Sequence, residues 1–166
     1  MPLLPIIAFP DPRLRQPAPP VARFDADLRE LAQDLLATLR AAPGIGITAP
    51  HCGVALRLVV LDLPDDEVRF YANPEIVAAS EERVRHVEGS VSMPGVTEPV
   101  ERHARVSLRY RGLDGQAHVE EAQGLLSICL QHEIDQLDGI FWIDRLSRLR
   151  RDRVLKRYDK IRKSEA

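Results

Sequence analysis

The sequence predicts an α+β fold, with antiparallel sheets packed around a central helix that carries the motif HExxQ. Three observations lead to this prediction. The segment 123–139 is apolar enough for a buried helix, strand patterns are grouped between two further helical segments, and these strands lack the helix-strand alternation of a parallel sheet. A chain of 166 residues can form one hydrophobic core and is short for two. We therefore expect a single domain, 1–166.

The composition excludes several classes of protein. The net charge of -2 predicts no general attraction to DNA or to a membrane surface. The sequence has no apolar run of membrane-spanning length, and its proline-containing N-terminus lacks a secretory pattern, so we expect a cytoplasmic protein. Two cysteines, Cys52 and Cys129, are too few for a disulfide scaffold and are expected to be free thiols.

Prolines punctuate the first 21 residues, which predicts an extended segment without a helix. The first helix follows, and Asp25 is its expected N-cap. Apolar residues then recur at the helical period and should pack in the core. They are Leu28, Leu31, Ala32, Leu35, Leu36 and Leu39.

Pro43 ends this helix, and the segment GIGITAPH, 44–51, follows. Its two glycines allow the backbone to pass close to a ligand, although a GxG pattern alone is more often a turn. Strands are then expected at 56–63, 68–71 and 75–79, with a loop at 87–96. A hairpin is expected to pair 106–110 with 117–120, because Asp114-Gly115 is a strong turn signal.

The central helix places polar side chains on one face. Because residues i and i+4 of a helix share a face, His132 and Gln136 lie together, with Glu133 beside them. In the zincin-type motif HExxH, two histidines bind a metal ion and the glutamate is the general base. Gln136 occupies the position of the second histidine, so the motif lacks one ligand.

The last helix, expected at about 146–163, combines a narrow apolar stripe with many basic residues. The favoured interpretation is a solvated helix held by that stripe. The alternative is docking on an anionic surface such as ribosomal RNA.

Three segments in this order, GIGITAPH, EGSVSMPG and QHEIDQLDG, resemble the three signature motifs of the peptide deformylase family. The family patterns are GxGxAAPQ, EGCLS and QHExDHLxG. The resemblance extends along the chain through 10–15, Asn73-Pro74, Val100-x-Arg102 and 144–146. It implies the family fold.

The resemblance also implies a chemistry, the removal of the formyl group from the N-terminal methionine of new polypeptides. In the family a divalent metal, typically iron or zinc, activates a water molecule, and the glutamate of the third motif transfers the proton. On this basis Glu133 is the expected catalytic residue, His132 is a metal ligand and the backbone N–H of Val91 stabilises the oxyanion. The expected substrate-binding residues are Gly44, Ile45, Gly46, Glu88, Gly89, Leu125, Ile128 and Cys129.

The departures from the family pattern are concentrated at the metal. Ser90 stands where the family has its cysteine ligand, Gln136 replaces the second histidine, and His51 replaces the glutamine that stabilises the oxyanion. A hydroxyl and an amide oxygen are poor ligands for iron or zinc compared with a thiolate and an imidazole. We therefore expect the metal to be bound weakly or not at all.

Two hypotheses follow. In the first, the chain binds an N-terminal formyl-methionyl peptide or a related small ligand, and its deformylase activity is weak or absent. In the second, His51 joins His132, with Gln136 or Ser90, in a rearranged metal site that supports an active hydrolase.

Overall fold

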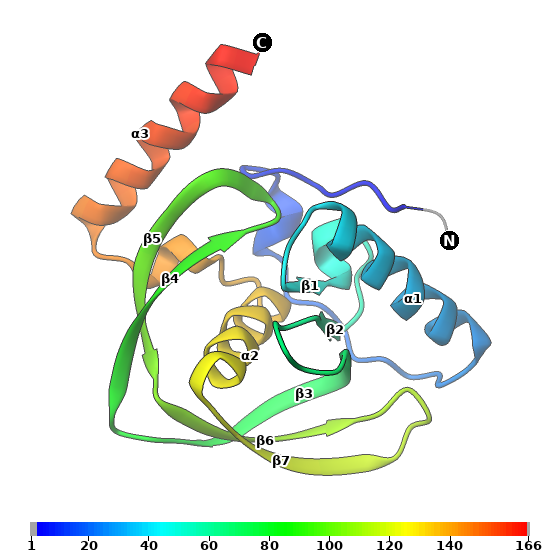
Figure 1. Ribbon diagram of the computed structural model, residues 1–166. Coiled ribbons are helices and arrows are strands. Elements are labelled where there is room, and N and C mark those ends of the chain that lie inside the picture. Colours follow the sequence, from blue (N-terminus) through cyan, green and yellow to red (C-terminus); the bar gives the residue numbers. More distant parts are fainter. Residues whose placement is uncertain (1–2, 166) are drawn as a thin grey trace.

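The computed structural model of the protein describes residues 3–165 (Figure 1). Within this range, short 3-10 turns lie at Pro12–Arg15, Ala49–Cys52 and Trp142–Arg145. The α-helices and strands are α1 (Ala26–Ala41), β1 (Gly46–Thr48), β2 (Leu58–Leu61), β3 (Arg69–Ala79), β4 (Arg83–Ser90), β5 (Met93–His103), β6 (Arg105–Arg111), β7 (Ala117–Gln123), α2 (Gly124–Leu137) and α3 (Arg148–Glu165).

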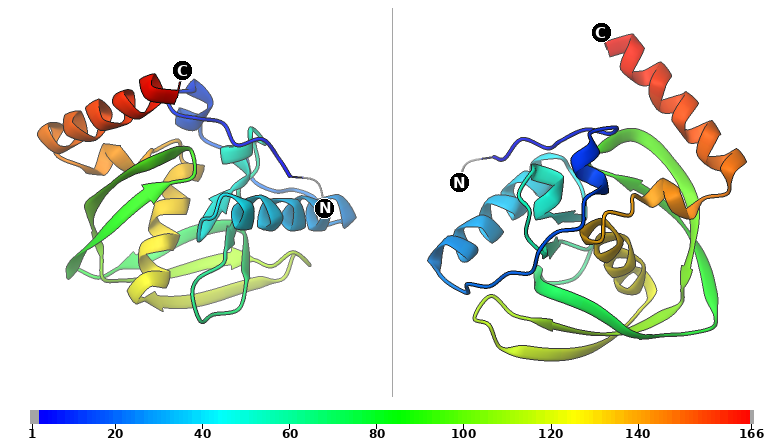
Figure 2. Two further views of the ribbon diagram at one scale, coloured as in Figure 1. Left: turned by 45° about the horizontal axis from the view of Figure 1, so that its top comes forward. Right: turned by 180° about the vertical axis from the view of Figure 1, so that it is seen from behind.

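The strands form two antiparallel sheets. The larger sheet has the order β1-β2-β3-β6-β7, and β4 pairs only with β5 in the smaller one. Helix α2 lies between the two sheets, as the views in Figures 1 and 2 show. The predicted α+β fold with a central helix is confirmed.

The buried strand β2 separates two parts of the core. Its side chains alternate, so Leu58 and Val60 pack with α1, whereas Val59 and Leu61 pack with α2. Helix α1 begins as predicted, because the Asp25 carboxylate accepts a hydrogen bond of 3.1 Å from the backbone N–H of Leu28. This packing fixes both helices against one sheet.

Two local predictions about strands were wrong. The segment 87–96 is no loop but the end of the long β4–β5 hairpin, in which Ser90 pairs with Met93. The strands expected at 68–71 and 75–79 are one strand, β3, with a bulge near Asn73. Asn73 is held there by hydrogen bonds in both directions with the backbone of Val21, a contact between segments far apart in sequence.

The N-terminal segment also departs from the prediction, because one 3-10 turn interrupts it. Asp11 caps this turn by accepting a hydrogen bond of 2.9 Å from the backbone N–H of Arg13. Prolines are compatible with the first turn of a helix, where a backbone N–H has no partner. The turn buries Leu14 in a cluster with Phe141 and Trp142, and so ties the N-terminus to the chain after α2.

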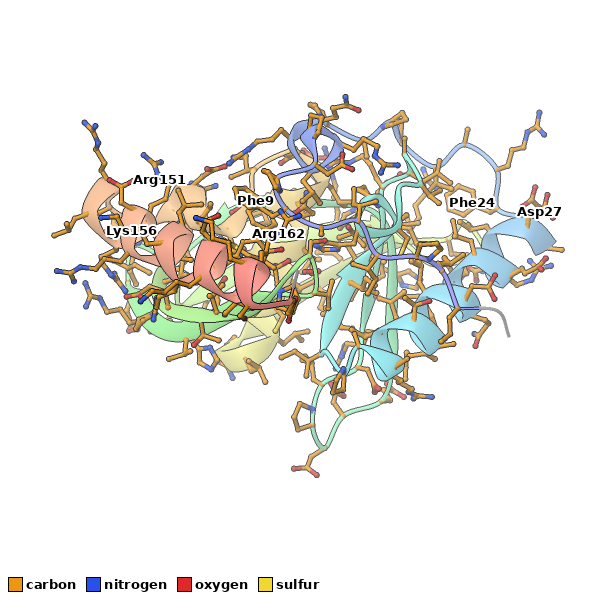
Figure 3. All side chains as sticks on the ribbon, turned by 90° about the horizontal axis from the view of Figure 1, so that it is seen from above. Phe9, Phe24, Asp27, Arg151, Lys156 and Arg162 are labelled. Carbon is orange, nitrogen blue, oxygen red and sulfur yellow. The ribbon has the colours of Figure 1, made fainter. Side chains whose placement is uncertain are left out.

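Helix α3 begins at Arg148, two residues later than expected, and lies on the opposite side of the molecule from α1 (Figure 3). Val154 and Tyr158 are its buried residues. Arg150 and Arg157 both bind the Glu98 carboxylate on β5, at 2.9 and 2.8 Å. Among residues 3–165, no helix is both long and apolar enough to cross a membrane.

We expect Glu98→Gln to loosen α3. Partial burial raises the pKa of Glu98, but hydrogen bonds from Arg150 and Arg157 outweigh it and lower the pKa below 4.5. The stabilisation is therefore present above pH 4.5 and is lost as the pH falls through the folded-state pKa. Amide exchange along α3 should become faster in the variant at pH 7, with a loss of about 1 kcal/mol.

The matched control for this experiment is Glu101→Gln, which removes an exposed carboxylate of the same strand that pairs with Arg83. Exchange in α3 should be unchanged there. Equal protection of α3 in wild type and Glu98→Gln at pH 7 would contradict the anchoring role of Glu98.

Candidate functional site

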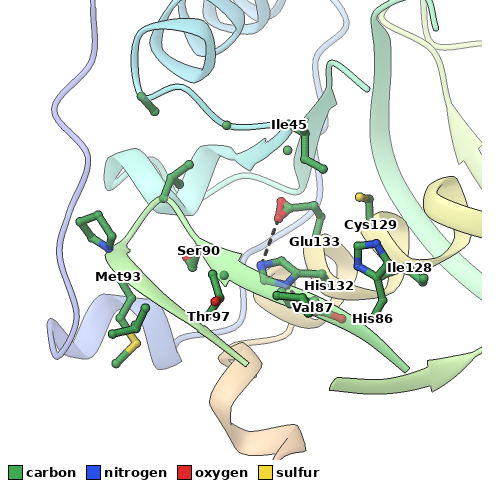
Figure 4. Close-up of a pocket in the computed structure, with 18 of the residues that line it drawn as sticks. Ile45, His86, Val87, Ser90, Met93, Thr97, Ile128, Cys129, His132 and Glu133 are labelled. Carbon is green, nitrogen blue, oxygen red and sulfur yellow. Dashed lines mark hydrogen bonds and ion pairs between the residues drawn. The ribbon is translucent and has the colours of Figure 1, made fainter. Parts of the chain in front are cut away.

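A cavity of about 370 Å³ lies where the segment before β1, the β4–β5 hairpin and α2 meet (Figure 4). It brings together most of the residues that the sequence analysis selected. Those lining it are Gly44, Ile45, Gly46, Glu88, Gly89, Ser90, Val91, Leu125, Ile128, Cys129, His132 and Glu133. His51 and Gln136 do not line the cavity, whereas His86 and Thr97 do and were not predicted.

Two glycines bring the segment before β1 close to the other walls. A Cβ atom on Gly44 would lie 2.9 Å from Cγ1 of Val91, which is closer than real Cβ contacts. A Cβ atom on Gly46 would lie 3.3 Å from the carboxyl carbon of Glu133. The GxG pattern therefore serves close packing against the β4–β5 turn and leaves room for the catalytic-position glutamate.

A buried network of charges supports the cavity from behind. Arg102 donates two hydrogen bonds to Glu88, at 2.8 and 2.9 Å, and a third to Asp135 at 2.7 Å. Arg145 binds the same Asp135 through two hydrogen bonds. The side chain of Arg102 is only 3% exposed. In the sequence, Arg102 was marked only by the Val100-x-Arg102 match, and Asp135 only as the aspartate of the third motif.

This network orients His132. The Nδ1 atom of His132 lies 2.8 Å from a Glu88 oxygen, and Nε2 lies 3.5 Å from Oε1 of Glu133 (Figure 4). Burial by itself lowers the pKa of His132, but the carboxylates of Glu133 and Glu88 raise it above its ordinary value. Both ring nitrogens are therefore engaged by carboxylates.

Glu133 has one oxygen without a partner. Oε1 faces His132, whereas Oε2 is buried and makes no hydrogen bond. The residue is 3% exposed, and burial raises its pKa to about 7 although His132 opposes the shift. A carboxyl group with a pKa near neutrality suits proton transfer.

Ser90 and Gln136, at the other two family ligand positions, make contacts within the protein. The Ser90 hydroxyl accepts a hydrogen bond of 3.1 Å from the backbone N–H of Ser92. The amide nitrogen of Gln136 donates a hydrogen bond of 2.8 Å to the backbone carbonyl of Leu14, which is 122 residues earlier in the sequence. Gln136 thus ties α2 to the N-terminal segment.

His51 is completely buried beside the cavity. Its Nδ1 atom accepts a hydrogen bond of 2.9 Å from the backbone N–H of Thr48, while Nε2 has no partner. Because a backbone N–H can only donate, Nδ1 carries no proton and Nε2 carries one. Burial, and to a smaller extent His132, lower the pKa of His51 to about 3, so the ring is neutral. His51 therefore carries an N–H donor at Nε2, which is buried and belongs to a residue that does not line the cavity.

The donor set does not fit iron or zinc. Within residues 3–165, no group of three or more histidine, cysteine, aspartate or glutamate side chains is arranged to hold a metal ion. The three family positions supply a hydroxyl, an imidazole and an amide. Thiolate and imidazole ligands are what these metals select.

The sequence matches known proteins over most of its length. The model of the family described as polypeptide deformylase matches residues 3–152. A protein of Brucella melitensis described as peptide deformylase-like is 63% identical over 159 residues, covering 95% of this chain and 97% of the relative. A peptide deformylase-like protein of Bradyrhizobium diazoefficiens is 59% identical over 162 residues, covering 97% and 95%.

The fold also matches solved structures. A peptide deformylase from Legionella pneumophila superimposes with a TM-score of 0.92 at 36% identity, covering 99% of this chain and 98% of that one. A peptide deformylase from Ehrlichia chaffeensis in complex with actinonin has a TM-score of 0.92 at 34% identity, with 99% of both chains covered.

Proposed function

This chain belongs to the polypeptide deformylase family, and from that premise we propose that it binds the N-terminal methionine of a peptide while hydrolysing N-formyl groups weakly or not at all. The observation that carries the proposal is a contrast within one site. The cavity walls at the expected substrate-binding positions are all present, whereas two of the three metal-ligand positions hold a serine and a glutamine.

The binding part of the proposal is supported by the shape and chemistry of the cavity. Its lining includes the apolar side chains of Ile45, Val91, Leu125 and Ile128. Such a pocket can take an unbranched apolar side chain such as that of methionine, and burying one stabilises a complex by about 1.5–3 kcal/mol. The Gly44 and Gly46 segment lets the ligand backbone approach closely.

The weak-hydrolysis part is supported by the groups available to activate water. A bound divalent metal lowers the pKa of its water by many units. Without that, Glu133 is the general base for water, and general-base catalysis contributes only about 10²–10⁴-fold. This is small compared with what amide hydrolysis requires.

The alternative, a rearranged metal site with His51 and His132, has one observation in its favour, because Nε2 of His51 is buried and unpaired. Its tautomer argues against it. Nε2 carries the proton while Nδ1 is used by Thr48, so His51 has no lone pair to offer unless that hydrogen bond breaks.

Elemental analysis of the purified protein, combined with a formyl-Met-Ala-Ser assay, tests the proposal. We expect iron and zinc far below one per chain and little or no turnover, because a hydroxyl and an amide replace two strong ligands. The contradicting result is about one metal ion per chain that is lost in His51→Ala but kept in the matched variant His118→Ala, whose histidine is exposed on β7. That outcome would establish the rearranged site.

Contact between α3 and ribosomal RNA stays a prediction. Its support is that the basic side chains on the helix remain exposed while Glu98 anchors the apolar side (Figure 3). The exposed basic residues include Arg148, Arg153, Lys156, Lys160 and Lys163.

A further inference from the structure

We propose that the cavity accepts an N-terminal methionine in its oxidised form, the sulfoxide, and that the ring N–H of His86 donates a hydrogen bond to the sulfoxide oxygen. The inference rests on the proposed function, because it assumes that the cavity holds the side chain of an N-terminal methionine. It adds the oxidation state of that side chain. It also gives a specificity-determining role to a residue that lies outside the three signature motifs.

His86 lines the cavity from strand β4. It is two residues before Glu88 in a regularly paired part of the strand, so both side chains point to the same face. The side chain of Glu88 reaches α2, where its carboxylate lies 2.8 Å from Nδ1 of His132. The side chain of His86 therefore also faces α2.

The contact between Glu88 and His132 sets the level at which His86 meets the helix. From Glu88 back to His86 the strand covers about 6.6 Å. From His132 back to Ile128 the helix covers about 6 Å, and these two helix residues share a face. Figure 4 accordingly shows His86 next to Ile128 and Cys129, which line the same cavity.

This part of the cavity is otherwise apolar. Leu125, Ile128 and Cys129 are spaced by three or four residues on α2, so their side chains share the face that lines the cavity. Burial raises the pKa of the Cys129 thiol to about 12, so the group carries no charge. An unbranched side chain that enters here meets apolar walls and the imidazole of His86.

The imidazole of His86 is free to donate to a ligand. Hydrogen bonds hold the rings of His103 and His132 to the protein, whereas within residues 3–165 none holds the ring of His86. The residue is also exposed. A histidine ring keeps at least one N–H donor in each of its tautomers.

A sulfoxide suits this combination of walls and donor. Oxidation keeps the length of the methionine side chain and turns a weak acceptor, the thioether sulfur, into a polar group with a strong acceptor oxygen. An apolar pocket without a donor rejects such a group, because burying an unpaired acceptor is costly. The N–H of His86 removes that cost.

Other side chains that end in an acceptor fit less well. A glutamine brings two further N–H donors that need partners of their own. A glutamate brings a charge into a cavity that already holds the carboxyl groups of Glu88 and Glu133. The sulfoxide is neutral and has no donor, so one hydrogen bond satisfies it.

Peptides that differ only in the first side chain test the inference by titration calorimetry with the full chain. They are N-formyl-Met-Ala-Ser, its two sulfoxide epimers measured separately, and N-formyl-norleucyl-Ala-Ser, which has no acceptor and reports on the apolar walls alone. We expect one sulfoxide epimer to bind the wild-type protein at least as tightly as the thioether. The selectivity is the ratio of the thioether Kd to the Kd of that epimer.

Three variants locate the effect. His86→Leu removes the donor, and the selectivity should fall about three- to tenfold, the range that a neutral hydrogen bond supplies, while the thioether affinity changes less than about twofold. His86→Gln retains an N–H donor and should keep the larger part of the selectivity. His118→Leu replaces an exposed histidine of β7, outside the cavity, and should behave as wild type. The cost of removing the sulfoxide from water is common to all four proteins and cancels in the comparison.

The outcomes separate this inference from the proposed function. If the wild-type protein binds the thioether more tightly than both sulfoxide epimers, the inference is overturned while the proposed peptide binding holds. An unchanged selectivity in His86→Leu also overturns it, because another group would then recognise the sulfoxide. If none of the four peptides binds, the proposed function fails and the inference falls with it. Thermal unfolding of the variants checks that each is folded, and the comparison of peptides on the wild-type protein stands without them.

Discussion

The double variant Ser90→Cys plus Gln136→His is expected to bind about one iron or zinc ion per chain and to hydrolyse N-formylmethionyl peptides on the order of 10³-fold faster than wild type. The substitutions place a thiolate and a second imidazole at the family ligand positions, next to His132. Metal assistance is worth several kcal/mol of transition-state stabilisation, and about 4 kcal/mol corresponds to this rate.

The scaffold is suited to accept these ligands. Residues 132 and 136 share a face of α2, and Ser90 lies in the cavity lining on the β4–β5 hairpin. Glu88 already holds Nδ1 of His132 at 2.8 Å, the kind of carboxylate support that orients a ligating histidine. The cost is the hydrogen bond from Gln136 to Leu14, which is a neutral one and worth about 1 kcal/mol.

The matched control adds Glu133→Gln to the double variant. That triple variant should still bind the metal and should lose the gained turnover, because it lacks the general base. Metal binding without faster turnover in the double variant would mean that the loss of the family glutamine at His51 is also decisive, and His51→Gln should then restore activity. Absence of metal from the double variant would contradict the view that the ligand positions are preserved in space.

Replacing Arg102 should have the largest effect on stability. Arg102→Met leaves the carboxylates of Glu88 and Asp135 buried without their common partner, with side chains only 5% and 12% exposed. Removing one partner of a buried ion pair costs about 3–5 kcal/mol. Urea unfolding should show this loss as a lower midpoint, since a domain with a typical stability of about 5–15 kcal/mol would still fold.

Arg105→Met is the matched control, because it makes the same change three residues later in an exposed pair. The side chains of Arg105 and Glu82 are 55% and 57% exposed, and such pairs contribute about 0–1 kcal/mol. Equal losses in the two variants would contradict a special role for the buried network. Glu88→Gln, which keeps one oxygen for Arg102, should fall between them.

Much of the fold could be predicted because its signals are local. The leucine period and the Asp25 cap of α1 depend on neighbours within a few residues, as does the Asp114-Gly115 turn between β6 and β7. The presence of three motifs in the family's order allowed the family to be identified from the sequence. These motifs also included most of the cavity lining, since substrate-binding positions cluster within them.

The tertiary structure decided which polar groups pair with one another. Arg102 meets Asp135, 33 residues away, and Gln136 meets Leu14, 122 residues away, contacts that no sequence period indicates. It also decided that Thr48 uses Nδ1 of His51 and that Oε2 of Glu133 stays unpaired. The sequence determined which chemical groups are present on each element, because periodicity and turn chemistry act over a few residues. Which of those groups find hydrogen-bond partners within the protein depends on how segments distant in sequence pack together. Only the tertiary structure determines that packing.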